Sequence, residues 1–192
     1  IMQLIESRAR TAPRAAALLL GYIKQIWLHA EDRELLAVNR VSSLRSARIH
    51  PALRPRPRQR MLSDAELRRF WSHAGDGGMH TLTVLALRLI LVTGQRPGEV
   101  AGMRWSELAG ATWIIPPARR GKTRTRHVVP LPELAQALLA AARADAARAG
   151  RNRHRPAHEH VFTIRNGQPL TVSALGRAVH RQGTRLHLEH PP

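Results

Sequence analysis

The stretch TGQRPGEVAGMRW, residues 93–105, places an arginine at a turn between two expected helices. Gly94 is suited to ending the apolar helix before the turn, and Pro97 is suited to beginning a short helix after it. Arg96 lies between them, so its side chain leaves the backbone at a rigid corner. A planar guanidinium held there can bind two phosphate oxygens. The alternative is an ordinary ion pair with Glu99 on the helix surface.

The composition is strongly basic. Among 192 residues there are 31 lysines and arginines against 13 acidic residues, which gives a formal net charge of +18. Such an excess usually indicates a nucleic-acid partner, although a GC-rich genome that favours arginine codons would also produce it. Only Lys24 and Lys122 are lysines.

The absence of cysteine excludes a disulfide scaffold, a thiolate nucleophile and a cysteine-based zinc site. It also fits a cytoplasmic protein. The most apolar run, VLALRLILV at 84–92, is too short to span a bilayer and contains Arg88. We therefore expect no membrane segment.

A proline- and arginine-rich segment divides the chain. Residues 13–37 show helical periodicity, whereas RPRPRQR at 54–60 cannot form a helix or a central strand. The predicted organisation is therefore a helical part over 1–50, a linker over 51–61 and a second domain over 62–192. The linker is suited either to lying along a phosphate backbone or to serving as a soluble tether.

The second domain shows alternating signals for helices and short strands. Ser63 and Glu66 form a capping-box pattern at the start of a helix. The expected helices are 79–93, a short one from Pro97, 132–149 and one beginning near Thr171 or Ser173, and the expected strands are 112–115 and 125–131, with 161–164 extended. The predicted fold class is mainly α with a small antiparallel β-hairpin, that is α+β.

The turn between the two expected strands is rich in positive charge. Residues 119–126 carry five basic side chains and no acidic one. A basic hairpin of this kind usually attracts phosphate. Lys122 is the one lysine among these arginines, and a lysine can give up a proton near neutral pH, which an arginine cannot do.

Residues 61–182 resemble the catalytic domain of the tyrosine recombinases, specifically the phage-type integrases. The resemblance is carried by LSDAELRRFW, LRLILVTGQRPGEVAGMRWSEL, WIIPPARRGKTRTRHVVPL and VFTIRNGQPLTVSAL. Residues 13–50 resemble the last helices of the family's DNA-clamping core-binding domain. The resemblance implies a catalytic-core fold, double-stranded DNA as partner, a homotetramer on DNA, and no metal or other cofactor. It also implies a bacterial cytoplasmic protein that associates with the nucleoid when bound to DNA.

The resemblance also implies roles for individual residues. Arg96 would bind the non-bridging oxygens of the scissile phosphate, and Lys122 would protonate the departing 5′-oxygen. Glu99 would support the surroundings of Arg96. The residues expected to bind DNA are Arg56, Arg58, Arg60, Arg119, Arg120, Arg124, Arg126 and His127.

The chain departs from the family's pattern after Gly183. The family continues with a His-x-x-Arg box and a nucleophilic tyrosine, but neither His187 nor His190 is followed by arginine three residues later, and the sole tyrosine is Tyr22. We therefore expect an integrase of a phage or other mobile element, incomplete at its C-terminus through truncation, frameshift or excision, and inactive alone. The alternatives are a non-catalytic DNA-binding remnant or regulator at recombination sites, and a generic basic nucleic-acid binder.

Overall fold

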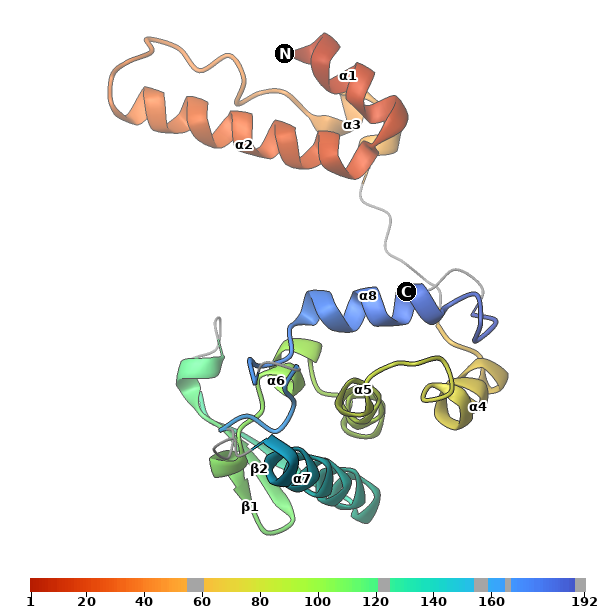
Figure 1. Cartoon of the computed structure of the whole chain (residues 1–192). Coiled ribbons are helices and arrows are strands. Elements are labelled where there is room, and N and C mark those ends of the chain that lie inside the picture. Colours follow the sequence, from red (N-terminus) through yellow and green to blue (C-terminus); the bar gives the residue numbers. More distant parts are fainter. Residues whose placement is uncertain (55–60, 121–124, 154–158, 165–166, 189–192) are drawn as a thin grey trace. The chain divides into compact units, whose positions relative to one another are not determined.

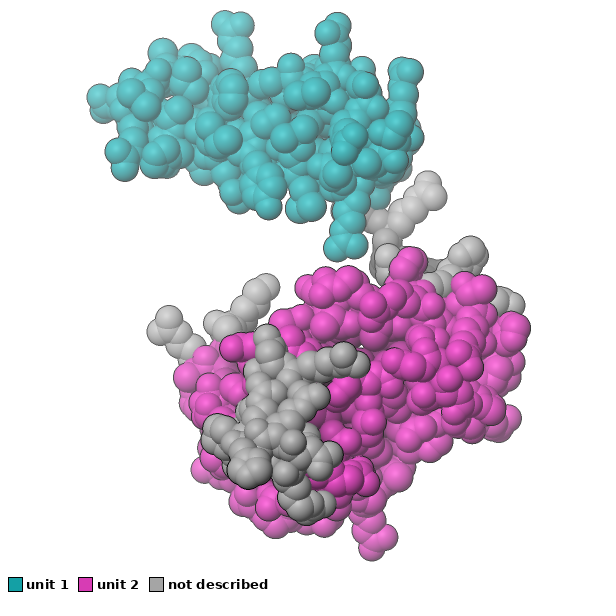
Figure 2. Space-filling model, viewed as in Figure 1, with its two compact units in different colours: residues 1–59 teal, residues 60–192 magenta. Residues whose placement is uncertain are grey.

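The computed structural model divides the chain into two compact units, Ile1–Gln59 and Arg60–Pro192 (Figure 2). It describes residues 1–54, 61–120, 125–153, 159–164 and 167–188, without the side chains of 149–153. Most of the described elements are helices, and a small antiparallel sheet accompanies them (Figure 1). The predicted fold class is therefore confirmed. None of the described helices is both long enough and apolar enough to cross a membrane.

Unit 1 is a small helical body built on two packed helices. Its elements are α1 (Met2–Thr11), α2 (Pro13–Asp32), α3 (Ser46–Ile49) and the 3-10 helix η1 (Pro51–Leu53). Pro13 begins α2, because its missing N–H is tolerated in a first helical turn. The buried residues of this unit are Ile5, Ala9, Ala16, Leu20, Ile49 and Leu53.

Unit 1 differs from the sequence prediction in three details. Helix α1 was not predicted, and α2 ends at Asp32 instead of continuing to residue 37. The 3-10 helix η1 lies where the linker was expected to begin, and Leu53 anchors it in the core of unit 1. Its burial makes this short segment part of the folded unit.

Helix α5 (Thr81–Thr93) is the central helix of unit 2. It lies between α7 (Glu133–Arg153) and α8 (Val172–Gln182) in Figure 1 and contacts both. Its residues are apolar almost all round, which is typical of a helix buried inside a domain. Gly94 ends α5 with a φ of 63°, the left-handed conformation that suits glycine at a helix C-terminus.

The sheet of unit 2 has three antiparallel strands in the order β1–β2–β3. The strands are β1 (Leu108–Ala109), β2 (Thr112–Ile115) and β3 (His127–Pro130). Trp113 lies opposite Val129 and Ile115 opposite His127. Trp113, Ile115 and Val129 belong to the main core together with residues of α5 and α7. The sheet therefore packs against the helices with one face and exposes Val128 on the other.

Unit 2 has four further helical elements. They are α4 (Asp64–His73), α6 (Pro97–Ala101), η2 (Trp105–Glu107) and η3 (Pro117–Arg119). The predicted capping box at the start of α4 is present, since the Ser63 backbone N–H donates to Glu66 at 2.8 Å and the Ser63 hydroxyl accepts from the Glu66 backbone. The short strand β1 was not predicted.

The segment after α8 packs back onto α4. Leu186 and Leu188 are buried in a cluster with Phe70, Ala74 and Val84. The Arg69 guanidinium donates from Nε to the Leu186 carbonyl and from Nη2 to that of His187, both at 3.3 Å. Residues 183–188 are therefore an integral part of unit 2.

Replacing Leu186 by alanine tests this packing. Because the side chain is 3% exposed, Leu186→Ala should lower the free energy of unfolding of unit 2 by about 2–5 kcal/mol. Urea unfolding followed by tryptophan fluorescence measures the change, in a Trp27→Phe background that removes the signal of unit 1. Leu134→Ala, at a position 50% exposed, is the control and should change stability by less than about 0.5 kcal/mol. Equal, small losses in both variants would contradict the packing.

Candidate functional site

Arg96 lies at a corner whose backbone is fixed on both sides. Gly94 turns the chain out of α5, and Pro97 begins α6. The Arg96 backbone N–H donates to Oε2 of Glu99 at 3.2 Å, which satisfies an N–H that the helix itself leaves without a partner. The corner therefore holds the Cα of Arg96 in place before any ligand arrives.

The side chain of Arg96 faces solvent, whereas that of Glu99 does not. The Arg96 side chain is 76% exposed and that of Glu99 is 8% exposed. Arg96 Nη1 lies 3.4 Å from Glu99 Oε1, so the predicted ion pair is confirmed. This pairing occupies one terminal nitrogen, and the rest of the guanidinium can bind an anion. Arg96 can therefore pair with Glu99 and bind an anion at the same time.

A second turn with the same arginine–glutamate hydrogen bond follows eight residues later, at Arg104. The Arg104 backbone N–H donates to Oε2 of Glu107 at 3.3 Å, as that of Arg96 does to Glu99. The Glu107 carboxylate also accepts from the indole N–H of the buried Trp113 at 2.9 Å. Glu107 is thus a buried acidic group tied to both the turn and strand β2.

Arg119 joins these two corners. Its Nη1 donates to the carboxylate of Glu107 in a short contact, and its Nη2 donates to the backbone carbonyl of Glu99 at 2.6 Å. Arg120 lies beside it, with Nε 3.6 Å from Oε1 of Glu99. The side chains of Arg119 and Arg120 are 16% and 15% exposed. The structure therefore places these two residues, expected to bind DNA, as internal partners of acidic groups.

The other strand of the hairpin is also tied to the corner. His127, the first residue of β3, has its Nε2 3.0 Å from Oε1 of Gln95, the residue before Arg96. Arg126 is exposed beside it. Of the remaining predicted site residues, Lys122, Arg124, Arg56, Arg58 and Arg60 lie outside the described residues.

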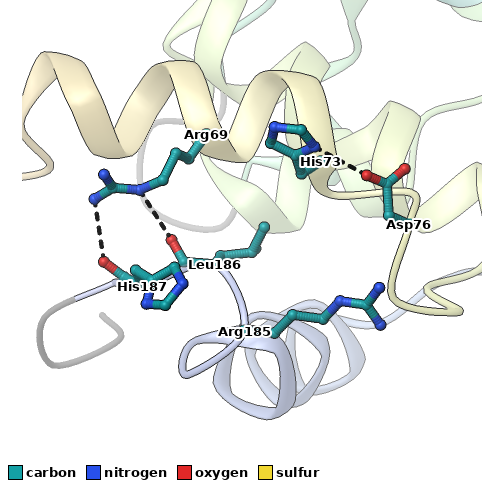
Figure 3. A pocket seen from close by; sticks show the side chains of 6 residues that line it. All are labelled: Arg69, His73, Asp76, Arg185, Leu186 and His187. Carbon is teal, nitrogen blue, oxygen red and sulfur yellow. Dashed lines mark hydrogen bonds and ion pairs between the residues drawn. The ribbon is translucent and has the colours of Figure 1, made fainter.

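A surface cavity lies elsewhere in unit 2, between α4 and the segment after α8 (Figure 3). It has a volume of about 350 Å³ and is lined by Arg69, His73, Asp76, Arg185, Leu186 and His187. Two of these polar groups already pair, because His73 Nδ1 lies 2.9 Å from Asp76 Oδ2. Arg69 is engaged with backbone carbonyls. The cavity lies where the segment after α8 packs on α4, and Arg96 is not among its lining residues.

Two further features bear on the chemistry of the site. Within the described ranges, no group of three or more histidine and acidic side chains is placed to hold a metal ion. Tyr22 lies on α2 of unit 1, with its side chain 60% exposed. Among the described residues, the exposed Arg96 guanidinium at its fixed corner is suited to binding an anion.

Comparison with known proteins identifies the family. The family model described as the phage integrase family matches residues 60–192. The chain belongs to the phage integrase family. The Arg96 corner and the hairpin after β2 both lie inside the matched region. The family resemblance predicted from the sequence is therefore confirmed.

One curated relative in this integrase family is the prophage integrase IntZ of Escherichia coli strain K12. The two sequences are 33% identical over 141 residues, which cover 72% of this chain and 34% of that protein. This chain thus spans about a third of the length of the relative.

Solved structures show that the integrase chain also has the family fold. A lambda integrase dimer bound to a COC′ core site superimposes with a TM-score of 0.74 at 17% identity, over 98% of this chain and 62% of that one. The Tn1549 transposon integrase in complex with circular intermediate DNA gives a TM-score of 0.63 at 15% identity, over 100% of this chain and 65% of that one. XerA recombinase gives a TM-score of 0.55 at 15% identity, over 100% of this chain and 61% of that one.

Sequence reasoning missed Glu107 and the inward orientation of Arg119. A signal was present, because the spacing R-x-x-E occurs twice, at Arg96–Glu99 and at Arg104–Glu107. In both cases the glutamate accepts from the backbone N–H of the arginine three residues earlier. The repeat therefore indicates two equivalent turns with buried carboxylates, each of which needs a cationic partner.

Substitutions at Arg96 and Glu99 should separate the ligand-facing residue from the one that supports it. Arg96→Ala should change the free energy of unfolding by less than about 0.5 kcal/mol, because the side chain is largely in water. Glu99→Ala should lower it by about 1–3 kcal/mol, since it removes the acceptor of the Arg96 N–H and the partner of Arg120. Urea unfolding measures both, and a larger loss for Arg96→Ala would contradict the assignment.

Proposed function

We propose that this chain supplies the phosphate-binding part of a site-specific DNA recombinase of the tyrosine class. The observation that carries the proposal is the Arg96 guanidinium, which is fixed at a rigid corner and steadied by a buried carboxylate, yet 76% exposed. Membership of the phage integrase family supports the same reading. In this proposal Arg96 binds the non-bridging oxygens of the phosphate at which the strand is cut.

The charges around the corner favour this role. Strand cleavage passes through a phosphoryl transition state that gathers negative charge, and cations held in advance stabilise it. Glu99 and Glu107 are balanced by Arg120 and Arg119, so the positive charge of Arg96 remains available to a ligand. Lys122, two residues after Arg120 in the sequence, would protonate the departing 5′-oxygen, as the family resemblance implies.

Double-stranded DNA is the proposed partner. Lambda integrase, whose fold this chain shares, has been solved as a dimer bound to a core site and as a tetramer bound to a Holliday junction. By analogy we propose that this chain assembles on duplex DNA, with unit 1 as part of the core-binding domain and unit 2 as part of the catalytic domain. The net charge of +18 supports such a partner.

In the family, as the resemblance implies, a tyrosine that follows a His-x-x-Arg box attacks the phosphate. The sole tyrosine of this chain, Tyr22, lies on α2 of unit 1, and the residues after Gly183 do not contain the family's His-x-x-Arg pattern. We propose that these residues alone bind DNA without cutting it. A non-catalytic DNA-binding role at recombination sites is the corresponding second candidate.

Binding of a 30-base-pair duplex of random sequence, measured by fluorescence anisotropy, tests the role of Arg96. Arg96→Ala should weaken binding by about tenfold, the expected loss of a charge-assisted hydrogen bond to phosphate. The matched control is Arg148→Ala. Arg148 is 65% exposed and, like Arg96, pairs with an acidic residue three positions away, Asp145, at 3.8 Å.

The control should weaken binding by no more than about twofold, because it removes one diffuse charge. For the unmodified chain, affinity should fall steeply as salt rises, through the release of counterions from DNA. Equal effects of Arg96→Ala and Arg148→Ala would mean that Arg96 acts only as one charge among many. That result would favour a generic basic binder over the phosphate corner.

A nicked suicide duplex tests the covalent step. Because Tyr22 does not follow a His-x-x-Arg box, we expect no protein–DNA adduct when these residues are incubated with the substrate and run on a denaturing gel. An adduct that disappears in Tyr22→Phe would overturn the assignment of this tyrosine. An adduct that survives Tyr22→Phe would show that another side chain acts as the nucleophile.

A further inference from the structure

The guanidinium of Arg119 is held by two acceptors inside unit 2. The side chain is 16% exposed and lies between the carboxylate of Glu107 and the backbone carbonyl of Glu99. The same carboxylate accepts from the indole N–H of Trp113, a fully buried residue of β2. One guanidinium therefore connects helix α6, the η2 turn and the hairpin segment that follows β2.

The contacts of Arg119 belong to a set that flanks Arg96 on both sides. On the β2 side of the hairpin, Arg119 and Arg120 contact Glu99, three residues after Arg96. On the β3 side, His127 contacts Gln95, one residue before Arg96. Both arms of the hairpin thus contact the residues on either side of Arg96, and Arg119 contributes a hydrogen bond to the backbone of Glu99.

The Arg119 guanidinium lies where a side chain at position 102 would begin, and this position is a glycine. A Cβ atom at position 102 would lie 2.9 Å from Nη2 of Arg119 and 3.5 Å from its Cζ. Contacts below 3.0 Å do not occur between such atoms in folded proteins, so a methyl group there would push the guanidinium away from its acceptors. An alanine at position 102 would therefore displace the end of the Arg119 side chain.

We propose that Arg119 is a positioning residue that locks the hairpin to the Arg96 corner and so sets where Arg96 and the hairpin arms meet a phosphate. The proposal rests on the proposed function, because it assigns Arg119 a task in the same anion site. Arg119 itself does not touch the phosphate. Its task is to hold two arms of the site in register, so that binding does not have to order them.

Three substitutions test the proposal. Arg119→Met keeps the apolar stem but removes the guanidinium, and Arg119→Lys keeps the charge but replaces the planar fork of donors with a compact ammonium group. Gly102→Ala leaves Arg119 in the chain and displaces it. The control Gly176→Ala lies inside helix α8 with no atom within 4 Å of the new methyl group, so it should be tolerated.

The first measurement needs no ligand. Arg119→Met and Gly102→Ala should each shift the indole N–H resonance of Trp113 in nitrogen–proton NMR spectra. They should also speed amide exchange in β2, β3 and α6 by about tenfold or more, while α8 exchanges as before. Gly176→Ala should do neither. Exchange that rises equally throughout unit 2, or does not rise at all, would overturn the locking role.

The second measurement uses the same 30-base-pair duplex, at a temperature where circular dichroism shows every variant folded. In the Arg119→Met background, Arg96→Ala should lower the affinity for the duplex by only about twofold instead of tenfold. The reason is that the hairpin no longer holds its position beside Arg96. Arg119→Lys should restore part of the difference. An undiminished tenfold loss in the Arg119→Met background would overturn the proposal.

The two proposals fail in different ways. If Arg96→Ala has no effect even when Arg119 is intact, the proposed phosphate site fails, and the exchange measurement still decides whether Arg119 locks the hairpin. The opposite outcome is that Arg96→Ala weakens DNA binding, while Arg119→Met changes neither the amide exchange rates nor the affinity loss caused by Arg96→Ala. In that case the phosphate site stands and the positioning role of Arg119 fails.

Discussion

A guanidinium held inside unit 2 by two acidic residues is the constraint on which the site depends. Moving an arginine and a carboxylate out of water is costly, and the cost is offset only where both are paired and hydrogen-bonded. Arg119 meets this condition through the Glu107 carboxylate and the Glu99 carbonyl. Because these partners come from different segments, the segments can meet only in one arrangement. Loss of the Glu107 carboxylate would leave the Arg119 guanidinium without its anionic partner.

This constraint explains why the exposed charge appears at Arg96 and not elsewhere in the corner. Glu99 and Glu107 are buried, and each lies beside an arginine from the hairpin. Arg96 adds a third cation to two anions, so the cluster keeps an excess of positive charge at its solvent-facing end. An anion that binds there meets a group whose backbone is already fixed. Little reorganisation is then required, which is the condition under which electrostatic stabilisation is most effective.

Local sequence patterns predicted the elements of unit 2 well and its side-chain partners poorly. The capping box at Ser63, the end of α5 at Gly94 and the strand TWII follow from signals within a few residues, and the structure contains all three. Strand β1 has two residues and depends on pairing with β2, so no local pattern predicts it. The direction of Arg119 depends on Glu107, twelve residues earlier.

The excess of arginine therefore indicates a partner without showing which arginines reach it. Within the run ARRGKTRTRH the sequence treats Arg119 and Arg126 alike, yet the first is largely buried and the second is exposed. The difference arises from Glu107: if Arg119 pointed to solvent, this carboxylate would remain in the interior without its cationic partner. A buried acid thus selects which arginine of this run turns inward.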